Sequence, residues 1–194
     1  YTRFLVLGDS FSEGMSDEII NGNYRGWADR VADVLAAQTP GFKYANFAIR
    51  GKLVKQVLED QIPQALPLIE GPQTLVSFHA GANDALRPNF DRNVVRTAYV
   101  KAVTQLVQTG GTILLFTVLE KNGNGGKASA VWEERMSSFN SIVREVADKF
   151  GLMVMDASID PQSSNPNLLA FDRLHLNYLG LGLITIVGIS LKPI

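Results

Sequence analysis

Short apolar runs alternate five times with amphipathic segments along this chain, and this alternation constrains the fold more than any single residue does. The first run, residues 4–7, ends at Gly8-Asp9 and is typical of a strand buried on both faces. Further strands are expected at residues 44–48, 74–78, 112–118 and 152–155. Apolar residues at helical spacing lie between the strands, at residues 27–35, 53–62, 95–106 and 136–150. The pattern therefore predicts strands and helices in strict alternation.

Glycine, proline and asparagine mark where these predicted helices begin and end. The helix after the second strand is expected to end near Pro63, and the next one at Gly110-Gly111. A loop rich in glycine and asparagine, residues 122–126, precedes the fourth helix. A last, strongly apolar helix is expected from Asn177 onward.

Five strands joined by helical crossovers predict a parallel sheet with both faces covered, which is a three-layer α/β/α sandwich. The flavodoxin-like strand order 2-1-3-4-5 is favoured. With 194 residues, 46% of them hydrophobic, and no linker rich in proline or serine, residues 1–194 are expected to form one domain.

The composition excludes several classes of function. A net charge of -1 provides no broad basic field for nucleic acid or a membrane surface. The absence of cysteine excludes disulfides, thiolate metal sites and a cysteine nucleophile. With two histidines and no close cluster of acidic residues around them, neither a metal nor another cofactor is expected. No apolar run reaches the roughly 18 residues that span a bilayer.

Cellular location and assembly are less constrained than the fold. No signal-peptide pattern precedes the first strand, which favours a cytoplasmic location. The chain starts at Tyr1, so a secreted form with a removed leader stays open, and the oligomeric state is not predicted.

The residues that could take part in catalysis directly follow the predicted strands and are not scattered along the chain. They are Ser10 after the first strand, Gly51 after the second, Asn83 after the third, and Asp172 and His175 after the fifth. The carboxyl ends of parallel strands meet at one edge of the sheet, where ligands bind in such folds. We therefore expect these five residues to converge on one site.

Each of the five residues has a task in acyl transfer. A serine hydroxyl needs a base to take its proton, and a histidine needs a carboxylate to orient it. Asp172 lies three residues before His175, a spacing that fits one helical turn or a tight loop. The backbone N–H groups of Ser10 and Gly51 and the side-chain amide of Asn83 are candidate donors to an oxyanion.

Four sequence blocks in this order resemble the SGNH or GDSL hydrolase family. The blocks are Gly8-Asp9-Ser10-Phe11-Ser12-Glu13-Gly14, residues 46–51, Gly81-Ala82-Asn83-Asp84 and Asp172-Arg173-Leu174-His175. The resemblance implies a flavodoxin-like fold and hydrolysis of a small-molecule ester without a metal. It also implies nucleophile Ser10, base His175, orienting Asp172 and an oxyanion hole formed by Ser10, Gly51 and Asn83.

Structural roles compete with these assignments. Ser10 alone is as typical of a helix cap as of a nucleophile. Asp9 and Asp84 are expected to accept hydrogen bonds from backbone amides in their turns. His79 is expected to be a hydrogen-bonded core histidine rather than a second base.

The sequence predicts a serine esterase that forms an acyl-enzyme, with short acyl chains favoured because the insertions are short. An acyltransferase or a carbohydrate deacetylase uses the same residues, and lipase or thioesterase activity also stays open. A receiver-like module is disfavoured because Met155-Asp156-Ala157 lacks the lysine expected there, and a ligand-binding module is the other non-enzymatic alternative. The substrate rim is expected at residues 16–25, 85–91 and 119–130.

Overall fold

The computed structural model of the chain describes residues 1–120, 127–158, 165 and 167. The predicted loop at 122–126 and the predicted last helix from Asn177 lie outside these residues.

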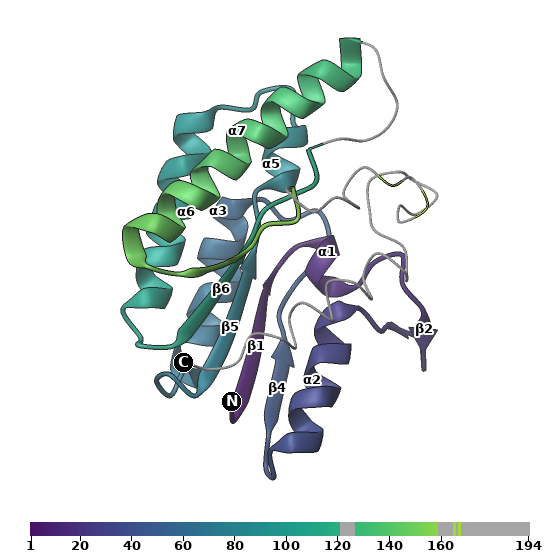
Figure 1. The fold of residues 1–194 in the computed structure, drawn as a ribbon, viewed down its shortest axis with the longest axis vertical. Helices are drawn as coiled ribbons and strands as arrows, with labels where there is room; N and C mark the ends of the chain where they lie inside the picture. Colours follow the sequence, from purple (N-terminus) through teal and green to yellow (C-terminus); the bar gives the residue numbers. More distant parts are fainter. Residues whose placement is uncertain (121–126, 159–164, 166, 168–194) are drawn as a thin grey trace.

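A five-stranded sheet forms the centre of the molecule (Figure 1). Its strands are β1 (Arg3–Gly8), β4 (Lys43–Asn46), β5 (Thr74–His79), β6 (Thr112–Phe116) and β7 (Met153–Met155). All neighbouring strands are parallel, and their order is β4-β1-β5-β6-β7. This is the order 2-1-3-4-5 counted along the main sheet, so the flavodoxin-like topology is confirmed.

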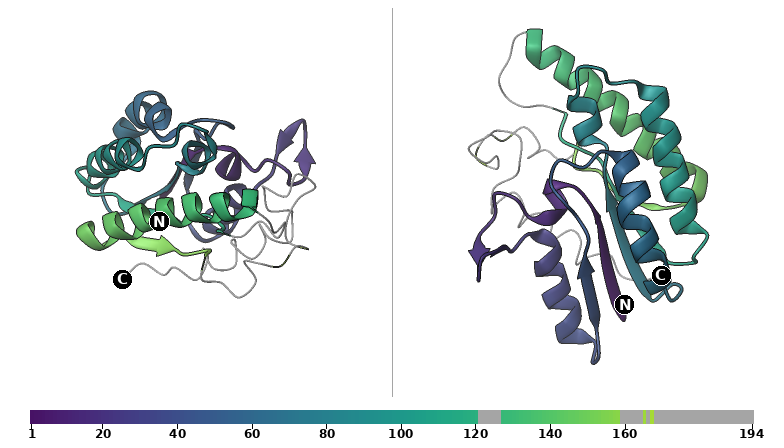
Figure 2. Two further views of the ribbon diagram at one scale, coloured as in Figure 1. Left: turned by 90° about the horizontal axis from the view of Figure 1, so that it is seen from above. Right: turned by 180° about the vertical axis from the view of Figure 1, so that it is seen from behind.

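Helices cover both faces of the sheet, which confirms the three-layer α/β/α sandwich (Figure 2). On one face lies α2 (Trp27–Gln38), and on the other lie α3 (Val54–Gln56), α6 (Arg92–Val107) and α7 (Lys127–Phe150). Two short helices, α1 (Ser10–Glu13) and α5 (Ala82–Leu86), follow the carboxyl ends of β1 and β5.

The apolar run in β1 is continuous because each face of the strand has its own core. Phe4 and Val6 pack in the cluster that contains Trp27 of α2. Leu5 and Leu7 pack in the larger cluster beneath α3, α6 and α7. Successive side chains of a strand point to opposite faces, so both faces require apolar residues.

The helix after β4 does not end near Pro63, and this prediction was wrong. It runs from α3 through the π-helical turn η1 (Val57–Gln61) into α4 (Ile62–Ala65) and the 3-10 turn η2 (Leu66–Leu68). In a regular α-helix a proline ring clashes with the carbonyl four residues earlier. Here the N–H of Ile62 bonds five residues back to the carbonyl of Val57, and the wider turn accommodates Pro63 inside the helix.

Residues 16–25 contain a hairpin where the sequence pattern predicted a loop. Strands β2 (Ile19–Ile20) and β3 (Asn23–Tyr24) pair antiparallel around Asn21-Gly22, and both turn residues have positive φ, 52° and 81°. An Asn-Gly pair is the commonest sequence signal of such a two-residue hairpin turn, so the sequence did contain the information.

Within the described residues, no helix is long and apolar enough to cross a membrane.

Candidate active site

Ser10 lies at the carboxyl edge of the sheet, on the first residue of α1 and two residues after the end of β1. Asp9 caps this helix, since its side chain accepts the N–H of Phe11 at 3.2 Å and its carbonyl accepts the N–H of Ser12. Ser10 is 8% exposed, and its position at this edge agrees with the predicted one.

The side chain of Gln61 holds the last residue of β1, Gly8, through two hydrogen bonds. Its buried amide accepts the N–H of Gly8 and donates to the carbonyl of Gly8, with both distances at 2.9 Å. The carbonyl of Gly8 also accepts the N–H of Ile49. The role of Gln61 was not predicted from the sequence. Gln61 is a polar residue on an otherwise apolar helix face, and its side chain points at Gly8 only because of the π-helical turn.

The second sequence block holds α1 in place. Asn46 donates to the carbonyl of Ser12 at 2.8 Å, and the Arg50 guanidinium forms an ion pair with Glu13. Arg50 also lies over the ring of Tyr24, which connects the β2–β3 hairpin to this block. Gly51 follows with a φ of 76°, a backbone conformation that residues with a side chain rarely adopt.

The third sequence block joins the first two. The Asn83 amide donates to Asp9 Oδ2 at 3.3 Å and to the carbonyl of Lys52 at 3.2 Å. One side chain thus contacts the neighbour of Ser10 and the neighbour of Gly51. The predicted convergence of the blocks that carry Ser10, Gly51 and Asn83 is seen, whereas Asp172 and His175 lie outside the described residues.

The structural roles expected for Asp9 and His79 are confirmed, whereas the backbone amide that Asp84 accepts from belongs to a segment thirty positions away rather than to its own turn. Asp9 accepts the N–H of Phe11, and Asp84 accepts the N–H of Val54 at 2.9 Å. His79 is buried at the end of β5, and its Nδ1 lies 3.3 Å from Asp9 Oδ1.

Burial raises the pKa of Asp84 from its ordinary value of 3.8 to about 6. The hydrogen bond from Val54 opposes this shift, and the negative charge of Asp9 adds to it. The folded state therefore binds this proton more tightly than the unfolded chain does. The resulting stabilisation is complete below pH 3.8 and is lost as the pH rises through about 6.

We expect Asp84→Asn to remove this pH dependence. At pH 8 the variant should be more stable than the native chain by about 1 to 2 kcal/mol, a value reduced for the partial exposure of the side chain. At pH 4 the difference should fall below about 0.5 kcal/mol, since Asn still accepts from Val54. Urea unfolding from pH 4 to pH 8 measures both values.

The matched control is Asp91→Asn, at an exposed residue that caps α6. Asparagine is an equally good cap, so this change should alter the free energy of unfolding at pH 8 by less than about 0.5 kcal/mol. A stability difference between Asp84→Asn and the native chain that is constant with pH would contradict the shifted pKa.

Among the described residues, no group of three or more histidine, aspartate or glutamate side chains could hold a metal ion.

A family comparison assigns the chain to a class of hydrolase, and the fold and the three convergent sequence blocks are consistent with it. Residues 6–181 match the model of the GDSL-like Lipase/Acylhydrolase family, and the chain belongs to that family. It is an SGNH-type carboxylic ester hydrolase. Comparison with curated protein sequences finds no match.

Solved structures share the fold at low sequence identity. An α/β hydrolase from the metagenome of Lake Arreo, Spain, is 18% identical with a TM-score of 0.77, and the match covers 97% of this chain and 95% of that one. The acetylxylan esterase Axe2 of Geobacillus stearothermophilus is 16% identical with a TM-score of 0.76, over 98% and 94% of the two chains. A lipase/acylhydrolase of Enterococcus faecalis is 18% identical with a TM-score of 0.72, over 97% and 94%.

Proposed function

We propose that this protein hydrolyses small esters with short acyl chains through an acyl-enzyme on Ser10. The observation that carries the proposal is the double contact of the Asn83 amide, with Asp9 beside Ser10 and with Lys52 beside Gly51. A serine and two candidate oxyanion donors thereby belong to one hydrogen-bonded unit at the edge of the sheet.

In the proposed first step, Ser10 Oγ attacks the ester carbonyl while His175 takes the hydroxyl proton and Asp172 orients the imidazole. The N–H groups of Ser10 and Gly51 and the amide of Asn83 stabilise the oxyanion. The Asn83 amide has two N–H bonds, and Asp9 and Lys52 accept from it through long contacts of 3.3 and 3.2 Å. To act as an oxyanion donor, this amide has to share or exchange one of the two contacts when substrate binds.

His175 then protonates the leaving alcohol, the alcohol departs, and the acyl group stays on Ser10 Oγ. Water attacks this acyl-enzyme with His175 as the base, the carboxylic acid leaves, and Ser10 regains its proton.

The acetylxylan esterase supports the assignment of the residues that lie outside the described part. Its structures include catalytic mutants in which a serine, an aspartate and a histidine are each replaced by alanine. That aspartate and histidine are three positions apart, which is the spacing of Asp172 and His175 in this chain.

Two observations support a preference for short acyl groups. The described residues add only short elements, namely α1, α5 and the β2–β3 hairpin, to the alternating plan of strands and helices, and none of these residues forms a large cap domain. The acetylxylan esterase, which has the same fold, is named for removing an acetyl group.

A panel of p-nitrophenyl esters with acetyl, butyryl and octanoyl groups tests the proposal. We expect kcat/KM to fall at least about tenfold from acetate to octanoate, because a site shaped for a short chain excludes the added methylenes. An acetylated sugar in the same panel tests carbohydrate deacetylation, and product analysis with added alcohol detects acyl transfer. Higher kcat/KM for octanoate than for acetate would contradict the short-chain preference.

A further inference from the structure

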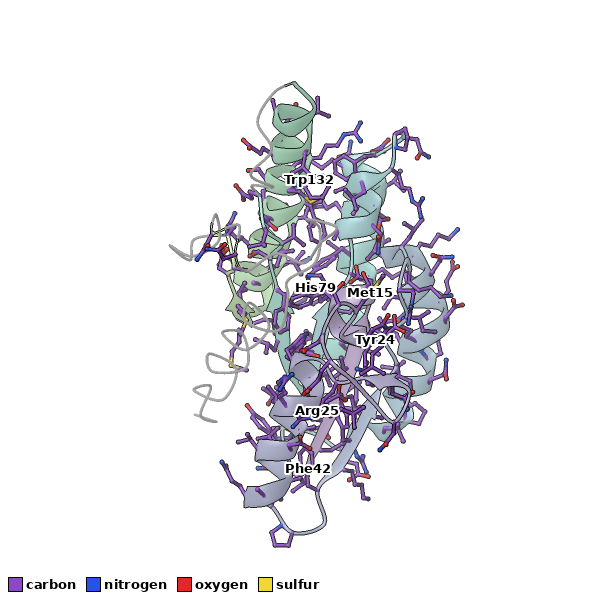
Figure 3. The ribbon with its side chains drawn as sticks, turned by 90° about the vertical axis from the view of Figure 1, so that its right-hand side faces the viewer. Met15, Tyr24, Arg25, Phe42, His79 and Trp132 are labelled. Atoms are coloured by element: carbon purple, nitrogen blue, oxygen red, sulfur yellow. The ribbon has the colours of Figure 1, made fainter. Side chains whose placement is uncertain are left out.

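His79 is a buried histidine that contacts Asp9, and Asp9 in turn contacts the candidate oxyanion donor Asn83. In Figure 3, His79 lies in the middle of the molecule, between Trp132 and Tyr24. Its side chain is 6% exposed, and its ring packs against Phe11 with the ring centroids 4.4 Å apart. Phe116 lies 6.0 Å away on an edge-to-face contact. These two aromatic contacts hold the plane of the imidazole.

The imidazole contacts one oxygen of a carboxylate whose other oxygen contacts Asn83. His79 Nδ1 lies 3.3 Å from Asp9 Oδ1, and Asn83 Nδ2 lies 3.3 Å from Asp9 Oδ2. A carboxylate only accepts hydrogen bonds, so His79 Nδ1 carries the hydrogen of this contact. His79, Asp9 and Asn83 therefore form a continuous chain of hydrogen bonds.

Asp9 depends on these donors because it is almost completely buried, at 2% exposure. Its side chain accepts from the N–H of Phe11, the ring of His79 and the amide of Asn83. A buried carboxylate that loses a donor reorients toward the donors that remain or toward water. Rotation of this carboxylate would move the oxygen to which Asn83 is bonded.

We propose that His79 is a positioning residue for ester hydrolysis: it fixes the Asp9 carboxylate so that Asp9 Oδ2 holds the Asn83 amide in place for the oxyanion. The inference rests on the proposed function, in which Asn83 is an oxyanion donor. His79 itself touches no reacting atom. It acts through Asp9, and its effect falls on the transition state rather than on substrate binding.

Two polar substitutions separate positioning from packing. The Asn amide in His79→Asn can place an N–H near the position of Nδ1, whereas His79→Gln places its amide near the position of Nε2, away from Asp9. We expect His79→Gln to lower kcat for p-nitrophenyl acetate about 10- to 100-fold with KM changed less than about threefold. His79→Asn should recover kcat to within about fivefold of the native value, and thermal unfolding verifies that both variants fold.

A double-mutant cycle tests whether the effect passes through Asn83. Asn83→Ala should lower kcat about 100-fold or more, and adding His79→Gln to it should cost less than about twofold further. A residue that only fills the core would instead lower kcat by the same factor in both backgrounds.

The outcomes also separate this inference from the proposed function. Three results would overturn the positioning role of His79 but leave the proposed function intact. The first is a large loss of kcat in Asn83→Ala together with native kcat in His79→Gln. The others are equal losses of kcat in His79→Asn and His79→Gln, and losses that multiply in the double-mutant cycle. Native kcat in Asn83→Ala would remove the oxyanion role of Asn83 from the proposed function, and the inference with it.

Discussion

Ser10→Ala is expected to lower kcat for p-nitrophenyl acetate by at least about 10⁴-fold and to abolish the burst of alcohol release, with the fold unchanged. The acyl-enzyme forms on Ser10 Oγ, and no other hydroxyl is proposed to replace it. Ser10 is the first residue of α1, where alanine is compatible with the helix. Steady-state and stopped-flow assays measure the activity, and circular dichroism measures the fold.

Ser12→Ala is the matched control, because Ser12 lies in the same short helix and is fully buried. Its hydroxyl has no hydrogen-bond partner among the described residues, so its loss should leave kcat within about twofold of the native value and should not lower stability. A fluorophosphonate probe should label the native chain and Ser12→Ala but not Ser10→Ala. Undiminished turnover in Ser10→Ala would overturn the assignment of the nucleophile.

Gly8→Ala is expected to destabilise the fold by about 3 kcal/mol or more. A Cβ at this position would lie 2.2 Å from the carbonyl oxygen of His79, and Gly8 has a φ of 152°. The obstacle is backbone of the neighbouring strand β5, so relief requires β1 and β5 to separate, and strain adds to the steric cost. Urea unfolding of Gly8→Ala measures the loss, and activity should fall with it because Ser10 lies two residues further on.

Gly41→Ala separates the steric clash from the strain of a positive φ. Gly41 has a φ of 76°, and a Cβ added there would meet no atom within 4 Å, so we expect a cost of about 1 to 2 kcal/mol from conformation alone. A loss in Gly8→Ala no larger than in Gly41→Ala would show that β1 and β5 can move apart at low cost.

The positions of the strands and the edge on which the candidate site lies could be predicted from the sequence, because the apolar runs and the residues that end them are local signals. Apolar runs such as residues 4–7 are found where β1 lies, and Ser10 and Asn83 follow their strands as expected. The Asn21-Gly22 pair also signals a hairpin turn in the sequence, but this segment was predicted to be a loop. Each of these features depends on residues that are close together in the chain.

Contacts between distant polar residues could not be predicted, because they depend on exact three-dimensional placement. Gln61 binds Gly8 across 53 positions, and His79 contacts Asp9 across 70. A histidine in a buried strand signals only that a partner must exist, not which residue provides it.

The π-helical turn before Pro63 has a consequence for how relatives of this chain are aligned. An α-helix rotates by about 100° for each residue, so one residue fewer within Val57–Gln61 would turn Gln61 away from Gly8. A relative with a regular α-helix in this segment must therefore be aligned with a one-residue gap there. A gap-free alignment would pair Gln61 with the wrong residue of such a relative. The residue that is spatially equivalent to Gln61 would be the neighbour of the paired one, one position away in the sequence.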